Sequence, residues 1–349
     1  MTIESNVNYC HQKNNAIETM RFFFTCIICL WHFRSIATFI HNGYIGVEFF
    51  FILSGFFLYI SYISHPDLGT IDFTLNKIKR FYPPLLISIF LLILLDRKQY
   101  LYISDFSPDG ILNKYFTHVH EVFFCQGLGL TEIYDINGPI WFISILLLAG
   151  AFLYSLLRNY NHFAISIIIP AISFWGISYL LQNGTHSFAN STHIPGFYSR
   201  CVRGVSEMGI GILLAYVLNR KEFLFRKYKK FIGLSAAISL LGIVLIVSAN
   251  GNYDYLLLFF IPLILSSCII KDSLLQKVFY HNFWRRFGDI SMYMYFIHYF
   301  VASVFFIIIG RYNLHFEKYV LLTASVYICA VMLAASILRF VSLKILNKI

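Results

Sequence analysis

Charged residues are scarce in this sequence. Asp, Glu, Lys and Arg make up 13% of its 349 residues, whereas a typical soluble domain has about 25%. Hydrophobic residues make up 58%, so the chain has too few polar side chains for a surface that faces water on all sides. This composition excludes an ordinary soluble domain and predicts an integral membrane protein.

The sequence also lacks the signs of a nucleic-acid or metal-binding protein. The formal charge is +10, but the lysines and arginines lie in short segments between apolar runs, which is typical of the positive-inside rule of membrane proteins. Of the seven cysteines, only Cys26 and Cys29 have CxxC spacing, and no second pair accompanies them. We therefore expect no nucleic-acid partner, no metal site and no redox centre.

Two further absences narrow the class of membrane protein. No repeat relates the two halves of the chain, although many transporters are built from such repeats. Ser54, in the tripeptide Leu53-Ser54-Gly55, lacks the Gly-x-Ser-x-Gly elbow that presents a hydrolase nucleophile. Neither a transporter with repeats nor a serine hydrolase is favoured.

Long apolar runs are what the sequence has in abundance, and a run of about 17–25 residues predicts a membrane-spanning helix. We predict one all-α membrane domain over residues 1–349 with about ten such helices, near 20–40, 46–63, 81–96, 139–157, 163–181, 200–218, 231–249, 254–270, 290–309 and 318–340. If the chain starts inside the cell, 19 of the 27 lysines and arginines fall in cytoplasmic segments and seven in outer segments. This asymmetry predicts that both termini are cytoplasmic.

Ionisable residues inside an apolar run are costly to bury, so each is a candidate for function. The first predicted span contains Arg21 near its cytoplasmic end and His32 near the middle of the membrane. The two are eleven residues apart, almost three helical turns, so they share one helix face about 16 Å apart along the axis. This arrangement suits a long, thin substrate with an anionic head, such as an acyl-CoA.

Glu48 is a second ionisable residue within an apolar run. It lies about one turn into the second predicted span, which enters from the outer side, and its depth falls within a turn or two of that of His32. A carboxylate beside His32 would fix the tautomer of the imidazole. Alternatively, Glu48 forms an ion pair with Arg34 for burial alone, and both pairings remain open.

Several motifs resemble the acyltransferase-3 family of membrane O-acyltransferases. In chain order they are Arg21-x10-His32, GVEFFFILSGF at 46–56, Arg80-Phe81-Tyr82-Pro83, PIWFIS at 139–144 and SMYMYFIH at 291–298. The resemblance covers nearly the whole chain and includes a layout of ten helices. It implies a transferase that acetylates cell-surface carbohydrates at a bacterial inner membrane.

The resemblance also implies roles for particular residues. His32 matches the catalytic histidine of the family, with Glu48 as its proposed neighbour. Arg21 matches an arginine that helps to hold the acyl donor. Lys77, Lys79 and Arg80 are then expected to contact the same donor.

The sequence departs from the family pattern at two places. Lys77 stands where the family has a second arginine, so this position lacks a guanidinium for bidentate phosphate binding. Many members also have a glutamate soon after the tryptophan that corresponds to Trp141, and this chain has none there. If that glutamate is essential in its branch of the family, this chain belongs to another branch or works by a different mechanism.

Three further residues are candidates for contacts to the substrate: Trp141, Arg203 and His298. Arg203 and His298 also have a purely structural interpretation. Arg203 is four residues before Glu207 and suits an ion pair on one helix, and His298 lies between two tyrosines that suit it for packing.

These observations predict a membrane O-acyltransferase. It would move an acyl group, expected to be acetyl, from acyl-CoA to a hydroxyl of a cell-surface glycan or its lipid-linked precursor, with His32 as general base. Acetyl-CoA would be a co-substrate, with no bound cofactor. The alternatives are a polytopic transporter or flippase of a glycan precursor, and a non-catalytic partner in polysaccharide synthesis that would tolerate loss of His32.

Overall fold

The computed structural model describes residues 14–95, 112, 116–126, 135–183, 193–194, 197–249, 251, 253–312 and 319–347. Helices dominate these ranges, as predicted. The long helices are α1 (Asn15–His32), α2 (Gly46–Ser64), α3 (Thr70–Leu95), α6 (Trp141–Phe163), α7 (Ile169–Gln182), α8 (Ser199–Arg220), α10 (Lys229–Ser248), α11 (Leu257–Ile269), α13 (Phe283–Tyr312) and α14 (Val320–Leu346). The short elements are α5 (Val119–Val122), α9 (Glu222–Lys227), α12 (Leu274–Val278) and an antiparallel pair of strands, β1 (His193–Ile194) and β2 (Phe197–Tyr198).

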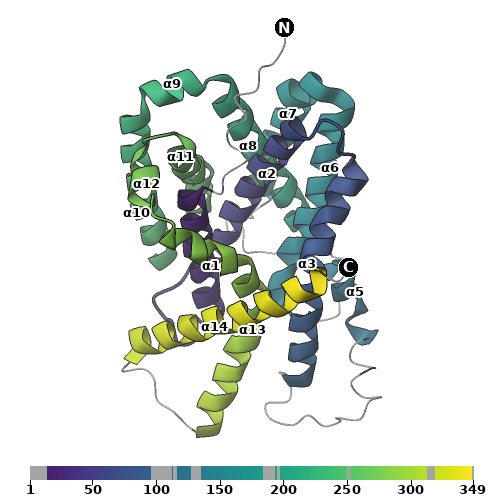
Figure 1. Cartoon of the computed structure of the whole chain (residues 1–349), viewed down its shortest axis with the longest axis vertical. Helices are drawn as coiled ribbons and strands as arrows, with labels where there is room; N and C mark the ends of the chain where they lie inside the picture. The colour runs from purple at the N-terminus through teal and green to yellow at the C-terminus, as the bar shows by residue number, and fades with distance from the viewer. Residues whose placement is uncertain are drawn as a thin grey trace.

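The long helices form a bundle with α1, α2 and α8 at its centre. Figure 1 shows α9 to α12 on one side of these helices and α6 and α7 on the other, with α14 lying across α13. α2 packs along α8 and α1 along α13. Aromatic side chains fill much of the core between them; Phe24 of α1 and Phe49 of α2, for example, stack with ring centroids 4.1 Å apart.

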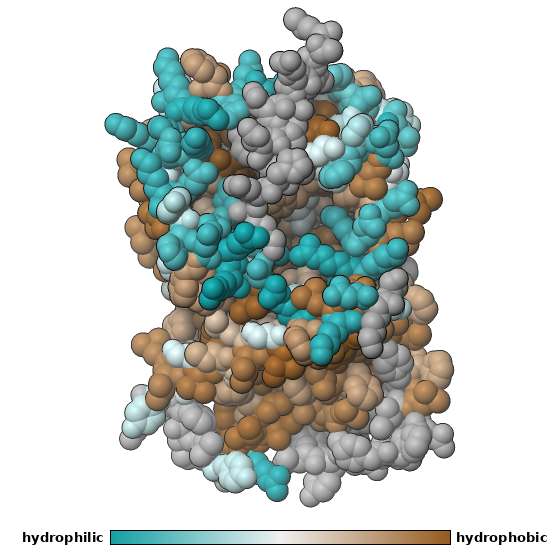
Figure 2. All heavy atoms as spheres, in the orientation of Figure 1, coloured by the Kyte–Doolittle hydropathy of each residue, from teal (hydrophilic) through white to brown (hydrophobic). Residues whose placement is uncertain are grey.

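Seven helical stretches in the described part of the chain are long and apolar enough to cross a membrane. They are Gly43–Ser64, Thr70–Leu95, Gly138–Gln182, Ser199–Arg220, Lys229–Ser248, Phe283–Tyr312 and Val320–Leu346. Figure 2 shows hydrophobic residues gathered over the lower part of one face and hydrophilic residues over the upper part, where α9 lies. These features fit a multi-pass membrane protein.

The predicted number of spans, about ten, is higher than seven for identifiable reasons. α1 contains Glu18 and Arg21 and is not among the seven, and α11 has only 13 residues. α6 and α7 are joined by a short π-helix (Ala164–Ile168) into one stretch of 45 residues, although a kink at Asn161 (φ 48°) interrupts it. A count of ten therefore remains a prediction.

The first helix differs from the predicted range 20–40 at both ends. It begins at Asn15, because the side-chain oxygen of Asn14 accepts hydrogen bonds from two backbone amides of the first turn, at 3.0 and 3.2 Å. It ends at His32. Residues 33–42 turn away from the helix axis, and Asn42 donates to two backbone carbonyls near the end of α10. His32 is thus the last helical residue of α1.

The third helix begins earlier than predicted. α3 starts at Thr70, so Pro83 and Pro84 lie inside the helix, whereas the sequence suggested a start at 81 with the prolines in the first turn. The basic segment before the prolines is itself helical. As a result, Lys77 and Arg80 are three residues apart on one helix and share a face.

Glycines allow α2 and α8 to touch along their backbones. A Cβ added at Gly55 of α2 would overlap the carbonyl of Met208, and one added at Gly211 of α8 would overlap the carbonyl of Ile52. Small residues at helix contacts let membrane helices approach closely, where van der Waals packing replaces the hydrophobic effect as the main attraction. This contact joins α2 to α8 at the centre of the bundle.

We expect Gly211→Ala to lower the stability of the folded protein by about 1–3 kcal/mol, because the added methyl group must push the backbones of α2 and α8 apart. Thermal unfolding of the purified protein in detergent measures the effect. Gly310→Ala is the matched control, since a Cβ at Gly310 meets nothing within 4 Å. Equal unfolding temperatures for the two variants would contradict the close contact.

Candidate active site

The candidate residues lie along the contact between α1 and α13, which run in the same direction. Near one end, the rings of Phe22 and Phe287 lie 4.9 Å apart; near the other, the rings of Phe33 and Phe306 lie 5.3 Å apart. Gly288 permits the close approach, because a Cβ at this position would overlap Glu18. The two helices thus form a single support with a distinct group of side chains at each end.

A cationic region occupies the end of this support that was predicted to be cytoplasmic. Nη1 of Arg21 donates to both carboxylate oxygens of Glu18, at 3.0 and 3.1 Å. Arg80 of α3 lies within electrostatic range of Arg21, Glu18 and Asp289. Arg339 of α14 is 3.8 Å from the carboxylate of Asp289. Three guanidinium groups therefore surround two carboxylates, which leaves an excess of positive charge.

The structure brings together some of the predicted donor-binding residues and separates one from the rest. Lys77 is half-buried, with its ammonium 4.6 Å from the centre of the Phe73 ring, and it lies within electrostatic range of Arg80. Lys79 is exposed, and in the described part of the chain it makes no ion pair. Arg21, Arg80 and Lys77 thus belong to one cationic region, with Lys79 outside it.

Two histidines meet at the other end of the support. The ring of His32 lies 5.1 Å from the ring of His298 and 5.7 Å from that of Tyr299, both on α13. His32 is half-buried, whereas His298 is fully buried. The hydroxyl of Tyr327 donates to the backbone carbonyl of His298 at 3.1 Å and holds this part of α13 in place.

The hydrogen bonds of His298 define its tautomer when the ring is neutral. Nδ1 lies 2.8 Å from the backbone carbonyl of Tyr295, and because a carbonyl only accepts, Nδ1 carries the proton. Nε2 is then an acceptor; it is buried and has no hydrogen-bond partner. Since the two ring nitrogens point in nearly opposite directions, Nε2 points away from the α13 backbone and is available to a hydroxyl or to another imidazole.

Glu48 does not lie against His32 as predicted. It forms an ion pair with Arg203 of α8, in which Nε of Arg203 is 3.2 Å from Oε2 of Glu48, and it contacts neither His32 nor Arg34. The same Nε is 3.1 Å from Oε1 of Glu207, so the predicted pairing of Arg203 with Glu207 is confirmed. The prediction for Glu48 was wrong because depth in the membrane does not tell which side of α2 faces which neighbour.

The triad of Glu48, Arg203 and Glu207 is almost completely buried, with exposed fractions of 0%, 3% and 1%. Two carboxylates share one guanidinium there. Removal of the arginine would leave both carboxylates buried without a counter-ion, which is costly in a dry interior. The triad therefore ties α2 to α8 at the depth where the glycine contact begins.

Trp141, the first residue of α6, lies beneath two arginines. The guanidinium of Arg200 is 4.5 Å from the centre of its ring, and that of Arg203 is 5.8 Å away. Arg200 was missed in the sequence, where it read as one of the few basic residues on the outer side. Its position could have identified it as a site residue, because it lies three residues before Arg203 at the start of a predicted helix.

The short segment before α6, predicted to lie on the outer side, fixes the start of this helix, and its polar residues were also missed. The carboxylate of Glu121 is fully buried and accepts hydrogen bonds from the backbone amides of Ile136 and Asn137, at 2.6 and 3.0 Å. The side chain of Asn137 donates to the carbonyl of Phe296 at 3.2 Å, and the hydroxyl of Tyr295 donates to the carbonyl of Pro139. These bonds hold the residues just before Trp141 against α13.

The same segment contains three residues whose ligand atoms lie within 4.8 Å of one another: His118, His120 and Glu121. All three have protein partners. Nδ1 of His118 is 3.1 Å from Glu121, and Nε2 of His120 is 3.0 Å from Asp135. Burial raises the pKa of Asp135, while its hydrogen bond to His120 favours the ionised form. These contacts explain the arrangement as a hydrogen-bonded network.

Comparison with known proteins identifies one family. The family model described as an acyltransferase domain matches residues 14–339, nearly the whole chain. No curated protein and no solved structure matches the chain. The matched range includes both ends of the α1–α13 support, the buried triad and the start of α6.

We expect Arg203→Met to destabilise the folded protein by about 3–5 kcal/mol, because Glu48 and Glu207 would lose their shared counter-ion. Arg200→Met is the matched control. It removes the same group three residues earlier on α8, where the main contact is with an aromatic ring, so its effect should stay below about 2 kcal/mol. Thermal unfolding of both variants in detergent tests this, and equal losses would show that the triad is not the stabilising element.

Proposed function

The chain belongs to the acyltransferase-3 family, and on that premise we propose that it transfers an acyl group, expected to be acetyl, from acyl-CoA to a hydroxyl of a cell-surface glycan or its lipid-linked precursor. His32 acts as the general base. The acyl-CoA is a co-substrate and the glycan is the acceptor. The proposed location is a bacterial inner membrane, with both termini in the cytoplasm.

The observation that carries the proposal is the pairing of a cationic region and two histidines at opposite ends of the same two helices. Arg21 and His32 are eleven residues apart in α1, which corresponds to about 16 Å along the axis. An extended acyl-CoA fits this spacing, with anionic phosphates near Arg21 and Arg80 and its thioester at His32. A flippase has no need of a phosphate site at that distance from a histidine.

The chemistry needs only groups that this arrangement supplies. The acceptor hydroxyl gives its proton to a ring nitrogen of His32 while its oxygen attacks the carbonyl carbon of the thioester. The resulting tetrahedral intermediate breaks its carbon–sulfur bond, and the imidazolium returns the proton to the departing CoA thiolate. The products are an ester and free CoA. A positioned general base contributes about 10²–10⁴-fold to such a reaction.

His298 and Trp141 are proposed to bind the acceptor. Nε2 of His298 is an acceptor without a partner in the described part of the chain, and it lies beside His32, so it can receive a hydrogen bond from a hydroxyl of the sugar next to the one that reacts. Trp141 and the arginines above it lie on the predicted outer side. Arg203 contributes there by holding the start of α8 rather than by a free charge, since Glu48 and Glu207 neutralise it.

The proposed orientation is supported by residues from separate segments that were all predicted to be cytoplasmic. Asn14, Arg226, Lys277 and Arg285 line one and the same cavity. If the order of membrane crossings were different, these four residues would lie on both sides of the membrane. The loss of one family arginine at Lys77 is compatible with this scheme, because Arg21 and Arg80 still provide two guanidinium groups for phosphate.

We expect His32→Ala to remove the acyl groups from the surface glycan of the host, as deletion of the gene does, while the variant protein accumulates normally in the membrane. The reason is that no other side chain on α1 reaches the position of the thioester. NMR of the base-labile O-acyl groups measures the outcome, and quantitative blotting of the membrane fraction measures the protein.

His162→Ala is the control for this experiment, because His162 is an exposed histidine at the end of α6. It should leave the glycan acylated. An acylated glycan in the His32→Ala strain would contradict the mechanism and favour a flippase or a non-catalytic partner instead.

We expect His298→Ala to lower kcat by about 10–100-fold, the effect of losing one hydrogen bond that orients the acceptor sugar. The KM for acyl-CoA should change little, because His298 is far from the cationic region. Initial rates with the purified enzyme separate the two constants. A raised KM for acyl-CoA with unchanged kcat would argue against a role at the acceptor.

A further inference from the structure

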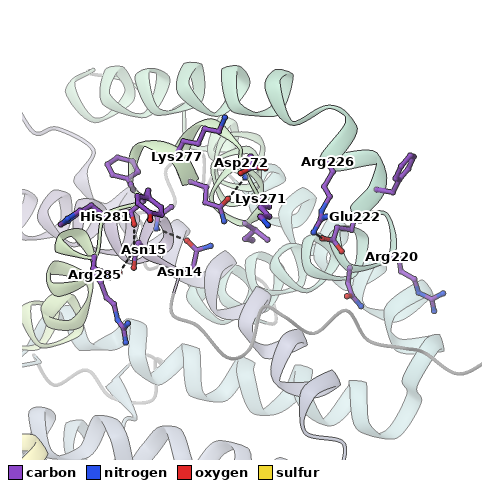
Figure 3. Close-up of a pocket in the computed structure, with 18 residues that line it drawn as sticks. Asn14, Asn15, Arg220, Glu222, Arg226, Lys271, Asp272, Lys277, His281 and Arg285 are labelled. Carbon is purple, nitrogen blue, oxygen red and sulfur yellow. Dashed lines mark hydrogen bonds and ion pairs between the residues drawn. The ribbon is translucent and has the colours of Figure 1, made fainter.

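A large cavity opens at the predicted cytoplasmic end of the bundle. Its volume is about 1590 Å³, above the 300–1,000 Å³ or so of a typical small-molecule site. The first residues of α1, the end of α8, α9, α12 and the start of α13 surround it. Figure 3 shows Glu222 and Arg226 on one side, His281 and Arg285 on the other, and Lys271 and Lys277 between them.

The charge of the cavity is positive, and the described part of the chain does not neutralise it. Its two acidic residues already have partners: Glu222 is 2.7 Å from Arg226, and Asp272 is 3.4 Å from Lys229. In the described part of the chain, the other cations of the wall make no ion pair; these are Lys271, Lys277, Arg285 and Arg220. Such a wall attracts a ligand with several negative charges, and phosphate oxygens are the acceptors that arginine and lysine bind best.

The wall also offers aromatic rings to a flat ligand. Phe223 of α9 and Tyr280 beside α12 are each 79% exposed, so their rings are accessible to a ligand. Exposed aromatic rings stack on the faces of nucleobases. The amides of the wall have protein partners; Asn219 bonds to Tyr59, and Oε1 of Gln276 accepts from the backbone amide of Asp272 at 2.7 Å. The unpaired cations and the exposed rings together match the chemistry of a nucleotide.

The cavity leads toward the cationic region of the active site. Arg285, Asp289 and Tyr293 follow one another at four-residue intervals on α13 and share one face. Asp289 and Tyr293 lie within electrostatic range of Arg80, and Arg285 lines the cavity. On α1, Ala16 lines the cavity and Arg21 follows five residues later. Residues of the cavity wall and of the cationic region thus follow one another along the same two helices, α1 and α13.

We propose that this cavity binds the nucleotide end of the acyl-CoA, with Lys277 and Arg285 on its 3′-phosphate, while the diphosphate lies near Arg21 and Arg80. The inference rests on the proposed function, since it assigns one end of the same donor. It divides the donor between two places: the adenosine and its 3′-phosphate occupy the cavity, and the arm that carries the thioester passes the cationic region. The head group of an anionic phospholipid shares the phosphate chemistry, but it brings no base for the exposed rings.

The test begins with binding, which requires neither acceptor nor catalysis. The full chain in phosphatidylcholine nanodiscs is titrated calorimetrically with adenosine 3′,5′-bisphosphate, the nucleotide portion without the arm. We expect binding by the wild type, weakened about tenfold by Lys277→Gln and by Arg285→Gln, the equivalent of one charged hydrogen bond. Arg286→Gln is the matched control: it removes the neighbouring exposed arginine, which does not line the cavity, and should change the affinity less than twofold.

Kinetics with two donors complete the test. Arg285→Gln should raise the KM for acetyl-CoA about tenfold and leave the rate with S-acetylpantetheine, which lacks the nucleotide, unchanged. The assignment is overturned if the bisphosphate does not bind, if Arg285→Gln and Arg286→Gln behave alike, or if both donors lose activity equally. It is also overturned if phosphatidylglycerol in the nanodiscs displaces the bisphosphate, because a lipid head group would then be the occupant.

The two proposals can fail separately. If the bisphosphate binds in the cavity but no acetyl group is transferred from acetyl-CoA, the proposed function fails and the nucleotide site stands. If wild-type enzyme uses acetyl-CoA and S-acetylpantetheine with the same KM, the nucleotide site is wrong and the acyl transfer stands.

Discussion

The close contact between α1 and α13 brings His32 against His298 and places Arg21 near the charges of α13. Gly288 brings α13 against Glu18, and from there the two helices run in the same direction. At one end this places Arg21 among the charges of α3 and α13; at the other it places the ring of His32 5.1 Å from that of His298. A bulkier residue at 288 would separate the helices and disrupt both ends together. This packing constraint thus determines which residues of α13 lie beside Arg21 and His32.

On the other side of α1, buried charge fixes how α2 packs against α8, near the proposed acceptor site. Glu48 and Glu207 share Arg203 in an interior with almost no exposure. Buried ion pairs add little net stability, but a broken one is costly, so they favour a single arrangement of the helices that carry them. Beside the triad, Trp141 starts α6, and hydrogen bonds hold the residues just before it against α13.

Much of the fold and part of the site were predictable from the sequence, because lipid imposes long apolar helices and a bias of basic residues. The face shared by Arg21 and His32 followed from helical periodicity alone. The partner of Glu48 did not, since depth in the membrane says nothing about which helix lies opposite. The end of α1 at His32 depends on Asn42 binding the distant end of α10. Contacts between segments far apart in sequence leave no local pattern.

A structure of the protein with a bound, non-hydrolysable acetyl-CoA analogue would show whether one donor spans from the cationic region to His32. We expect the carbonyl carbon of the analogue beside the His32 ring, close enough for a hydroxyl between them to reach it at about 3–3.5 Å, with the diphosphate near Arg21 and Arg80. A carbonyl lying more than one helical turn from His32, or phosphates on the opposite side of the membrane from Arg21, would contradict it.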